Sequence, residues 1–175
     1  MMSGLVQAWT GLIAICLLYA AACDISVRLI PNRLSAAVIA LALPFRLLNH
    51  DLVPGIAVTL VMFTVLTGVW LLHLIGGGDV KFWTACSLLI PPSAAAQGLF
   101  SLRVILFGGG VAMAYLMLRL LVRGRRPIAD PPPSRHWIVR VWRAEQWRAR
   151  RRGSIPYGVA IALSAWVNFT PMVPR

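Results

Sequence analysis

Two aspartates, Asp24 and Asp79, are the side chains of this sequence best placed for acid–base chemistry. The chain of 175 residues has only five acidic side chains, and each of these two lies where a long apolar run meets a more polar segment. Two carboxylates held close together share one proton, because both cannot easily be ionised at once. One can then act as a general base on water while the other donates a hydrogen bond to a carbonyl group. Taken alone, either aspartate could instead be a helix-end residue near lipid headgroups.

The remaining titratable side chains are weaker candidates. Three acidic residues are interpreted as charges in solvated segments: Asp51, Asp130 and Glu145. The histidines are scattered and lack a carboxylate pattern, and the second of them is interpreted as packed or interfacial within a span: His50, His73 and His136. The cysteines form no Cys-x-x-Cys pair and are interpreted as buried, unreactive thiols: Cys16, Cys23 and Cys86. We therefore expect no metal site, no cofactor and no disulfide framework.

A run of three glycines, Gly76, Gly77 and Gly78, directly precedes Asp79. Because glycine has no side chain and tolerates positive φ, such a run allows another backbone to approach the carboxylate closely. A second run, at 108–110, has no acidic residue beside it and is predicted to be a helix-packing surface.

The residues that follow Asp24 predict a turn between two helices. Pro31 ends any helix that continues past Asp24, and Asn32 is predicted to be the N-cap of the next helix. Arg28, four residues after the aspartate, could pair with it if the helix extends that far, or could hold a lipid phosphate group.

The composition predicts an all-α polytopic membrane protein with a single domain over 1–175. Apolar residues make up 59% of the chain and charged residues 13%, and the mean hydropathy is +0.76. Soluble domains have about 45–50% apolar and about 25% charged residues, so a soluble enzyme, a disordered chain and a disulfide-stapled secreted domain are excluded. A bilayer core needs roughly 20 apolar residues in a helix. Six runs are predicted to span the membrane, the second being the least secure: 4–22, 34–48, 55–75, 83–101, 103–121 and 155–173.

The basic residues predict the orientation of these spans. Ten of the 17 Lys and Arg residues lie in the segment 123–152, and cytoplasmic loops collect such residues. If this segment is cytoplasmic, the loops 23–33 and 76–82 lie on the same side, and the N-terminus lies outside. The two aspartates then share one face and a similar depth. Arg46 is expected at the far side, where its long stem could reach the interface. No basic residue precedes the first span, so we expect it to be retained and not removed as a signal peptide.

Three short motifs combine in this sequence. They are Asp24 with Ile30-Pro31-Asn32, the run Gly-Gly-Gly-Asp-Val-Lys at 76–81, and Ile-Pro-Tyr-Gly-Val-Ala at 155–160. Together they resemble the type IV prepilin peptidase family, the intramembrane aspartyl proteases of the G-x-G-D type. The resemblance covers about residues 8–122 and 154–170, and the short build is similar to the tight-adherence (Flp) pilus branch.

The resemblance implies a function for each motif. The expected activity is cleavage of a prepilin, a pilin-like precursor, just after a glycine on the cytoplasmic side of its hydrophobic segment, at the cytoplasmic face of the bacterial inner membrane. Asp24 and Asp79 would be the catalytic aspartates. The residues expected to bind substrate are Gly76, Gly77, Gly78, Pro156, Tyr157 and Gly158. The residues expected to support the site are Arg28, Pro31, Asn32 and Lys81.

Two features depart from the family pattern. Many relatives have a basic residue two positions after the first aspartate, where this chain has Ser26, and Arg28 could substitute for it. The cysteine-bearing insertion that longer members use for N-methylation is absent, so no methyltransferase activity is expected.

The basic segment 123–153 lies outside the resemblance and is predicted to be a cytoplasmic loop or an interfacial segment. It interleaves tryptophan with arginine, which suits an amphipathic helix on anionic lipid. A contact with an acidic partner or with the prepilin is an alternative. Nucleic acid is not expected as a partner, because no nucleic-acid-binding motif accompanies the charge. Oligomerisation stays open.

Two other classes of function remain open on the sequence. The chain could be a non-catalytic assembly component of a pilus or secretion system that keeps the fold without the chemistry. It could also be a small ion- or proton-coupled transporter. The lack of an acidic residue deep within a span argues against the transporter, because transport sites lie near the bilayer midplane.

Overall fold

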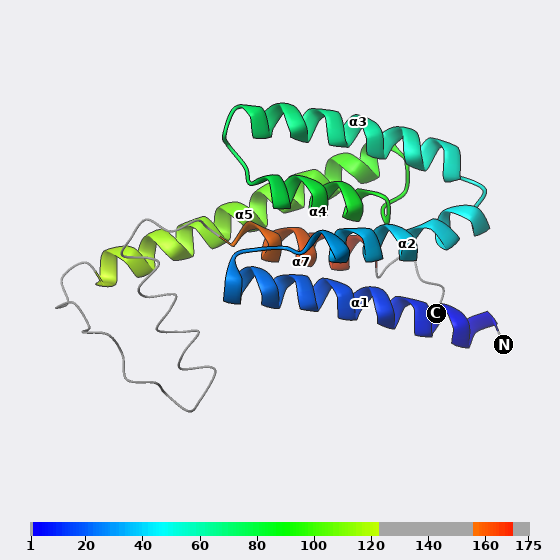
Figure 1. Cartoon of the computed structure of the whole chain (residues 1–175), viewed down its shortest axis with the longest axis horizontal. Helices are drawn as coiled ribbons and strands as arrows, with labels where there is room; N and C mark the ends of the chain where they lie inside the picture. Colours follow the sequence, from blue (N-terminus) through cyan, green and yellow to red (C-terminus); the bar gives the residue numbers. More distant parts are fainter. Residues whose placement is uncertain (1, 123–155, 170–175) are drawn as a thin grey trace.

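In a computed structural model that describes residues 2–122 and 156–169, the chain forms helices that lie side by side, and these residues contain no strand (Figure 1). The all-helical prediction is confirmed for this part of the chain. The helices are α1 (Met2–Val27), α2 (Asn32–Leu48), α3 (Leu52–Leu71), α4 (Gly77–Ser87), α5 (Ala94–Val122) and α7 (Tyr157–Phe169). The basic segment 123–153 lies outside the described residues.

Three of these helices are long and apolar enough to cross a membrane. Their candidate spans are Gln7–Val27 in α1, Leu52–Leu71 in α3 and Ala94–Met117 in α5. The other described helices coincide with apolar runs, but they are shorter. At 1.5 Å per residue, the 11 residues of α4 extend over only about 16 Å, roughly half of a bilayer core.

The prediction of one helix over 83–101 is wrong. The chain leaves the helical conformation after Ser87 and re-enters it at Ala94. Pro91 and Pro92 lie between these points, and proline lacks the N–H that a continuous helix needs. The Gln97 side chain stabilises the turn, because its Nε2 donates to three carbonyl groups at the end of α4: Ser87 at 2.9 Å, Ile90 at 3.0 Å and Pro91 at 3.2 Å. Hence α5 starts earlier than the predicted 103–121 span and is longer.

Arg46 also stabilises the turn between α4 and α5. The prediction that its side chain reaches the membrane interface is wrong. Its side chain is buried, with 4% of the residue exposed. Arg46 Nε donates to the Leu88 carbonyl at 2.8 Å, a second nitrogen donates to Ile90, and Nη1 pairs with Asp51 Oδ2 at 2.6 Å. Asp51 is therefore the partner of a buried cation, and its interpretation as a solvated loop charge is wrong.

We expect Arg46→Leu to lower the free energy of unfolding by about 3 kcal/mol, because it leaves a partly buried carboxylate and two carbonyl groups without their donor. Denaturant unfolding of the detergent-solubilised protein measures the effect. Arg33→Leu is the matched control, since Arg33 lies on the same helix with an exposed side chain. Equal stability of the two variants would contradict this role for Arg46.

The helices run in alternating directions, so the connections gather at the two ends of the bundle (Figure 1). The end of the bundle at which α1 ends and both α4 and α7 begin is called the aspartate end. The short helices α4 and α7 lie inside the bundle: α7 packs against α1, α4 and α5, and α4 packs against α2, α3 and α7. The α4 side chains Phe82, Ala85 and Cys86 are fully buried. A rigid interior therefore holds the first turns of α4 and α7 in place.

Candidate active site

A cavity of about 550 Å³ opens at the aspartate end of the bundle. Two described connections at this end contribute to it, residues 28–31 between α1 and α2 and residues 72–76 between α3 and α4. Its lining residues are Asp24, Arg28, Leu29, Ile30, His73, Leu74, Ile75, Gly76, Gly78, Asp79 and Tyr157. The structure thus brings Asp24 and Asp79, which are 55 positions apart in the sequence, to one cavity.

Asp24 lies in the last turns of α1, against the beginning of α7. Only 5% of the residue is exposed, and its Oδ2 accepts a hydrogen bond from the Val159 N–H at 3.2 Å. Val159 belongs to the first turn of α7, whose N–H groups have no partner within the helix. These N–H groups and the positive end of the helix dipole stabilise a charged carboxylate at this position.

Gly158 makes the close approach of α7 to Asp24 possible. A Cβ atom at this position would lie 2.9 Å from Asp24 Oδ2 and 2.7 Å from Ile30 Cδ1. Pro156, also predicted to belong to the site, is buried just before α7. Neither Pro156 nor Gly158 lines the cavity. Both residues therefore lie on the side of Asp24 that faces α7, away from the cavity.

Asp79 lies in the first turn of α4, with Gly76 as the N-cap residue of that helix. Its carboxylate is hydrogen-bonded to the Gly76 backbone, as an acidic residue at the third helical position often is. A Cβ atom on Gly76 would lie 2.9 Å from Asp79 Oδ2, so the first glycine of the run is needed for this approach. Gly78 lines the cavity with open space around it, whereas Gly77 packs beside the Trp70 indole.

The environment of Asp79, which lies outside the three candidate spans, favours its protonated form. Burial and the negative charge of Asp24 raise the pKa of Asp79 to about 6. The hydrogen bond from the Gly76 backbone lowers this pKa, but by less than the other two effects raise it. Because the charge of Asp24 is one cause of this raised pKa, the titration of Asp79 depends on whether Asp24 is ionised.

This pKa predicts how stability depends on pH. The folded protein binds the Asp79 proton more tightly than the unfolded chain, so Asp79 stabilises the fold at low pH. This contribution is lost as the pH rises from about 4 through about 6. We expect the free energy of unfolding of the wild type, measured against that of Asp79→Asn, to fall by about 2 kcal/mol between pH 4 and pH 7. Denaturant unfolding of the two proteins over this range measures it; a difference that is constant or rises with pH would contradict the assignment.

Arg28 and His73, one from each connection, flank the two carboxylates. Both have a left-handed backbone, with φ of 59°, and both line the cavity. The Arg28 guanidinium lies 4.9 Å from the centre of the Tyr115 ring on α5 and donates a hydrogen bond to the Tyr115 hydroxyl. His73 lies just after α3 and is exposed, so its interpretation as a residue within a span is wrong.

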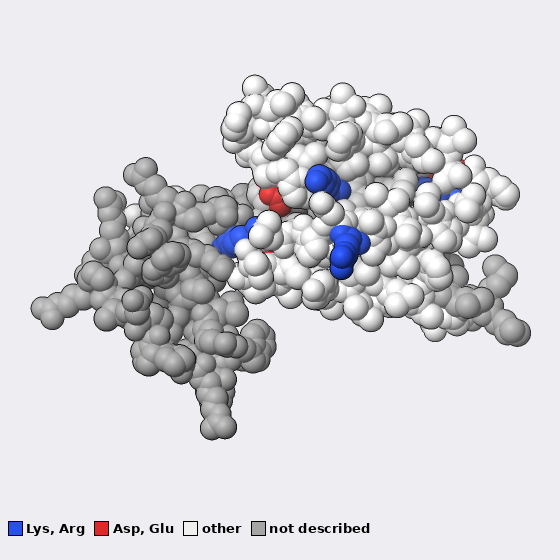
Figure 2. Space-filling model, viewed as in Figure 1, with Lys and Arg blue, Asp and Glu red and all other residues white. Residues whose placement is uncertain are grey.

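Asn32 and Lys81 contact each other outside the cavity. Lys81 Nζ donates to Asn32 Oδ1 at 3.2 Å, which ties the start of α2 to α4. The prediction that Asn32 is an N-cap is wrong, because Pro31 occupies that position in an extended conformation and Asn32 is the first helical residue. This contact therefore braces α4, the helix on which Asp79 lies, against the start of α2. Among the described residues, charged side chains are few on the face shown in Figure 2, where a small acidic area lies near basic side chains close to the start of α4.

Tyr157 closes the cavity from the side of α7. Its ring stacks on Trp83 of α4, with centroids 6.2 Å apart, and fits against Gly108 of α5. A Cβ atom on Gly108 would lie 2.5 Å from the Tyr157 ring. The prediction that the second glycine run is a packing surface is confirmed at Gly108, while residues 109 and 110 face open space. Sequence reasoning missed the contribution of α5 to the site, because no spacing rule links Gly108 or Tyr115 to residues so distant in the chain.

The helical bundle and the carboxylate-lined cavity together define a membrane protein with acid–base groups at one end. Residues 11–122, more than half of the chain, match the type IV leader peptidase family, and the chain belongs to this family. Membership indicates a protease of the aspartic type that acts on pilin precursors in general. No curated protein and no solved structure matches the chain. Within residues 2–122 and 156–169, no three His, Cys, Asp or Glu side chains gather in a way that could hold a metal ion.

Proposed function

We propose that the protein is an intramembrane aspartyl endopeptidase that removes the leader of a prepilin just after a glycine, with Asp24 and Asp79 as its catalytic residues. One observation carries this proposal: two carboxylates from different helices line one cavity, and the charge of one raises the pKa of the other. The arrangement supplies the base and the acid that peptide hydrolysis requires.

The surroundings of each carboxylate suggest its role. Asp79 holds the shared proton, because burial and its neighbour raise its pKa to about 6. Asp24 stays ionised at the beginning of α7 and takes a proton from water as the water oxygen bonds to the scissile carbonyl carbon. Asp79 donates its hydrogen bond to the carbonyl oxygen. The proton gained by Asp24 then passes to the departing amine as the C–N bond breaks, and Asp24 returns to its ionised form.

The neighbouring residues are proposed to bind and position the substrate. Gly76, Gly78 and Tyr157 line the cavity, where exposed glycine backbone can pair with an extended peptide. Pro156 and Gly158 hold α7 against Asp24, and Gly77 completes the first turn of α4. Arg28 supplies a cation at the rim of the site.

The arrangement of the connections supports a proposed orientation in the membrane. We propose six membrane segments in a bacterial inner membrane, of which α4 extends only part of the way across, with the N-terminus outside and the cavity facing the cytoplasm. The connections 28–31 and 72–76 lie at one end together with the beginning of α7 (Figure 1), as alternating spans require. We also propose that the protein belongs to the Flp branch of the family. Purified protein in detergent, mixed with a prepilin and followed by mass spectrometry of the products, tests the proposed activity and its cleavage position.

A further inference from the structure

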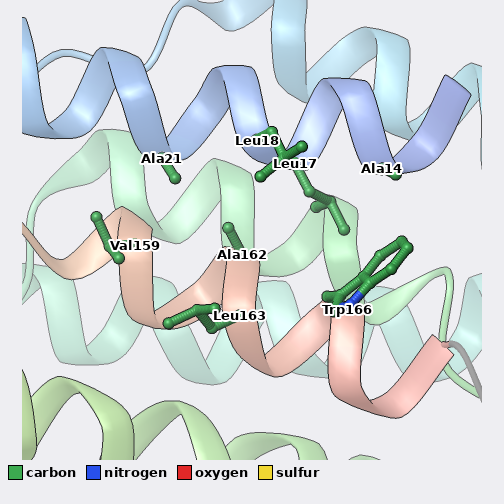
Figure 3. A pocket seen from close by; sticks show the side chains of 8 residues that line it. All are labelled: Ala14, Leu17, Leu18, Ala21, Val159, Ala162, Leu163 and Trp166. Carbon is green, nitrogen blue, oxygen red and sulfur yellow. The ribbon is translucent and has the colours of Figure 1, made fainter. Parts of the chain in front are cut away.

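A second hollow, of about 320 Å³, lies between α1 and α7 and is lined only by apolar side chains (Figure 3). We call it the α1/α7 groove. Its lining residues are Ala14, Leu17, Leu18 and Ala21 of α1, and Val159, Ala162, Leu163 and Trp166 of α7. An apolar cavity of about 150 Å³ can hold benzene, so this groove has room for two or more large apolar side chains.

The groove lies at membrane depth and presents the surface that helix packing in lipid requires. Its α1 residues belong to the candidate span Gln7–Val27. Between Ala14 and Ala21, two helical turns extend over about 10 Å. Three alanines form part of the lining: Ala14, Ala21 and Ala162. The Leu18 side chain lies beside them, with 71% of the residue exposed. Small residues let a second helix approach closely, which is the main source of helix association in lipid.

One end of the groove lies near the candidate active site, although the two hollows share no lining residue. Ala21 lies three residues before Asp24 on α1, and Val159 lines the groove while its N–H donates to Asp24. An apolar helix that lies along α1 and α7 would therefore end beside the Asp24 carboxylate. A peptide bond just beyond the end of such a helix would be delivered to the cavity.

We infer that the α1/α7 groove is the docking site for the apolar helix of the precursor. The inference rests on the proposed function and deepens it, because it names the surface that would bind the membrane-embedded part of the substrate. Side chains of the docked helix would fill the hollow between Ala14 and Ala162, and Leu18 would contact the flank of that helix. The carboxylates would then select the bond by its distance from the end of the helix.

The test compares two substrates of the same peptidase. One is a full precursor with its apolar helix, and the other is a short peptide that contains the leader and the cleavage site only. We expect Ala14→Leu, which fills the groove two to three turns away from Asp24, to raise KM for the full precursor by at least about tenfold. The short peptide should be cut with unchanged kcat/KM. Ala8→Leu is the matched control, since Ala8 is exposed on α1 outside the groove.

The outcomes separate the groove from the activity. If the wild type cuts neither substrate, the proposed function fails. If it cuts both, but Ala14→Leu leaves the full precursor unaffected or slows both substrates equally, the groove proposal fails while the function stands.

A photoreactive residue identifies the occupant directly. Benzoylphenylalanine in place of Leu18, in an Asp79→Asn background that leaves the precursor uncut, should form an adduct with the apolar helix of the precursor. The same probe in place of Leu12, an exposed α1 residue outside the groove, should not. An adduct at Leu18 with only lipid or a second copy of the chain would overturn the proposal.

Discussion

Replacing Asp24 or Asp79 by asparagine, one at a time, is expected to reduce prepilin cleavage by at least about 10³-fold, within the range of about 10² to 10⁴ for loss of a positioned general acid or base. Each substitution keeps the size of the side chain and removes only its acid–base function. Asp79→Asn should also be as stable as the wild type or more stable at neutral pH, because burial and Asp24 disfavour the charged form of Asp79. Rates of product formation by purified proteins measure the first effect, and denaturant unfolding measures the second.

The matched control is Asp51→Asn, the same chemical change at the opposite end of the bundle. Asp51 pairs with Arg46 and does not line the cavity, so this variant should lose some stability but cut the precursor at the wild-type rate. Cleavage that survives in both Asp24→Asn and Asp79→Asn would leave the non-catalytic and transporter functions as the alternatives.

Gly158→Ala is expected to reduce kcat by at least about 10²-fold, although it adds a single methyl group outside the cavity. The new Cβ atom would lie 2.9 Å from Asp24 Oδ2 and 3.0 Å from its Cγ, so α7 or the carboxylate must move. A displacement of about 1 Å at a catalytic group can cost about a hundredfold in rate. Cleavage kinetics measure this effect, and elution as a single folded species in gel filtration checks that the variant keeps its fold.

The control for Gly158→Ala is Gly98→Ala on α5. A Cβ atom on Gly98 would meet nothing within 4 Å, and alanine favours a helix over glycine by about 1 kcal/mol. This variant should therefore be slightly more stable and fully active. Wild-type activity of Gly158→Ala would show that the approach of α7 does not position Asp24.

The apolar pattern predicts most of the helices but not their connections. Hydropathy alone continues across residues 88–90, so the run 83–101 looks like one span. The structure breaks it because Pro91 and Pro92 cannot extend a helix and Gln97 binds the freed carbonyl groups. Arg46 likewise has partners in a turn more than 40 positions away, which no local pattern indicates.

The candidate site is partly visible in the sequence. Spacing and motif likeness single out Asp24, Asp79 and the glycines before Asp79, and these residues meet at one cavity or its border. The apolar run that contains His73 predicts a residue within a span, yet His73 lines the cavity. The packing of Gly108 on Tyr157 and the contact of Tyr115 with Arg28 depend on how α5 crosses the bundle. Such contacts are set by tertiary packing and have no signature in a single sequence.

The most direct test of the paired carboxylates is a carbon-13 NMR titration of the Asp79 carboxyl group in the wild type and in Asp24→Asn. We expect Asp79 to titrate near pH 6 in the wild type and at a clearly lower pH in Asp24→Asn, because the charge of Asp24 helps to raise its pKa. The same titration in both proteins, or one near the ordinary value of about 4 in the wild type, would contradict a coupled pair.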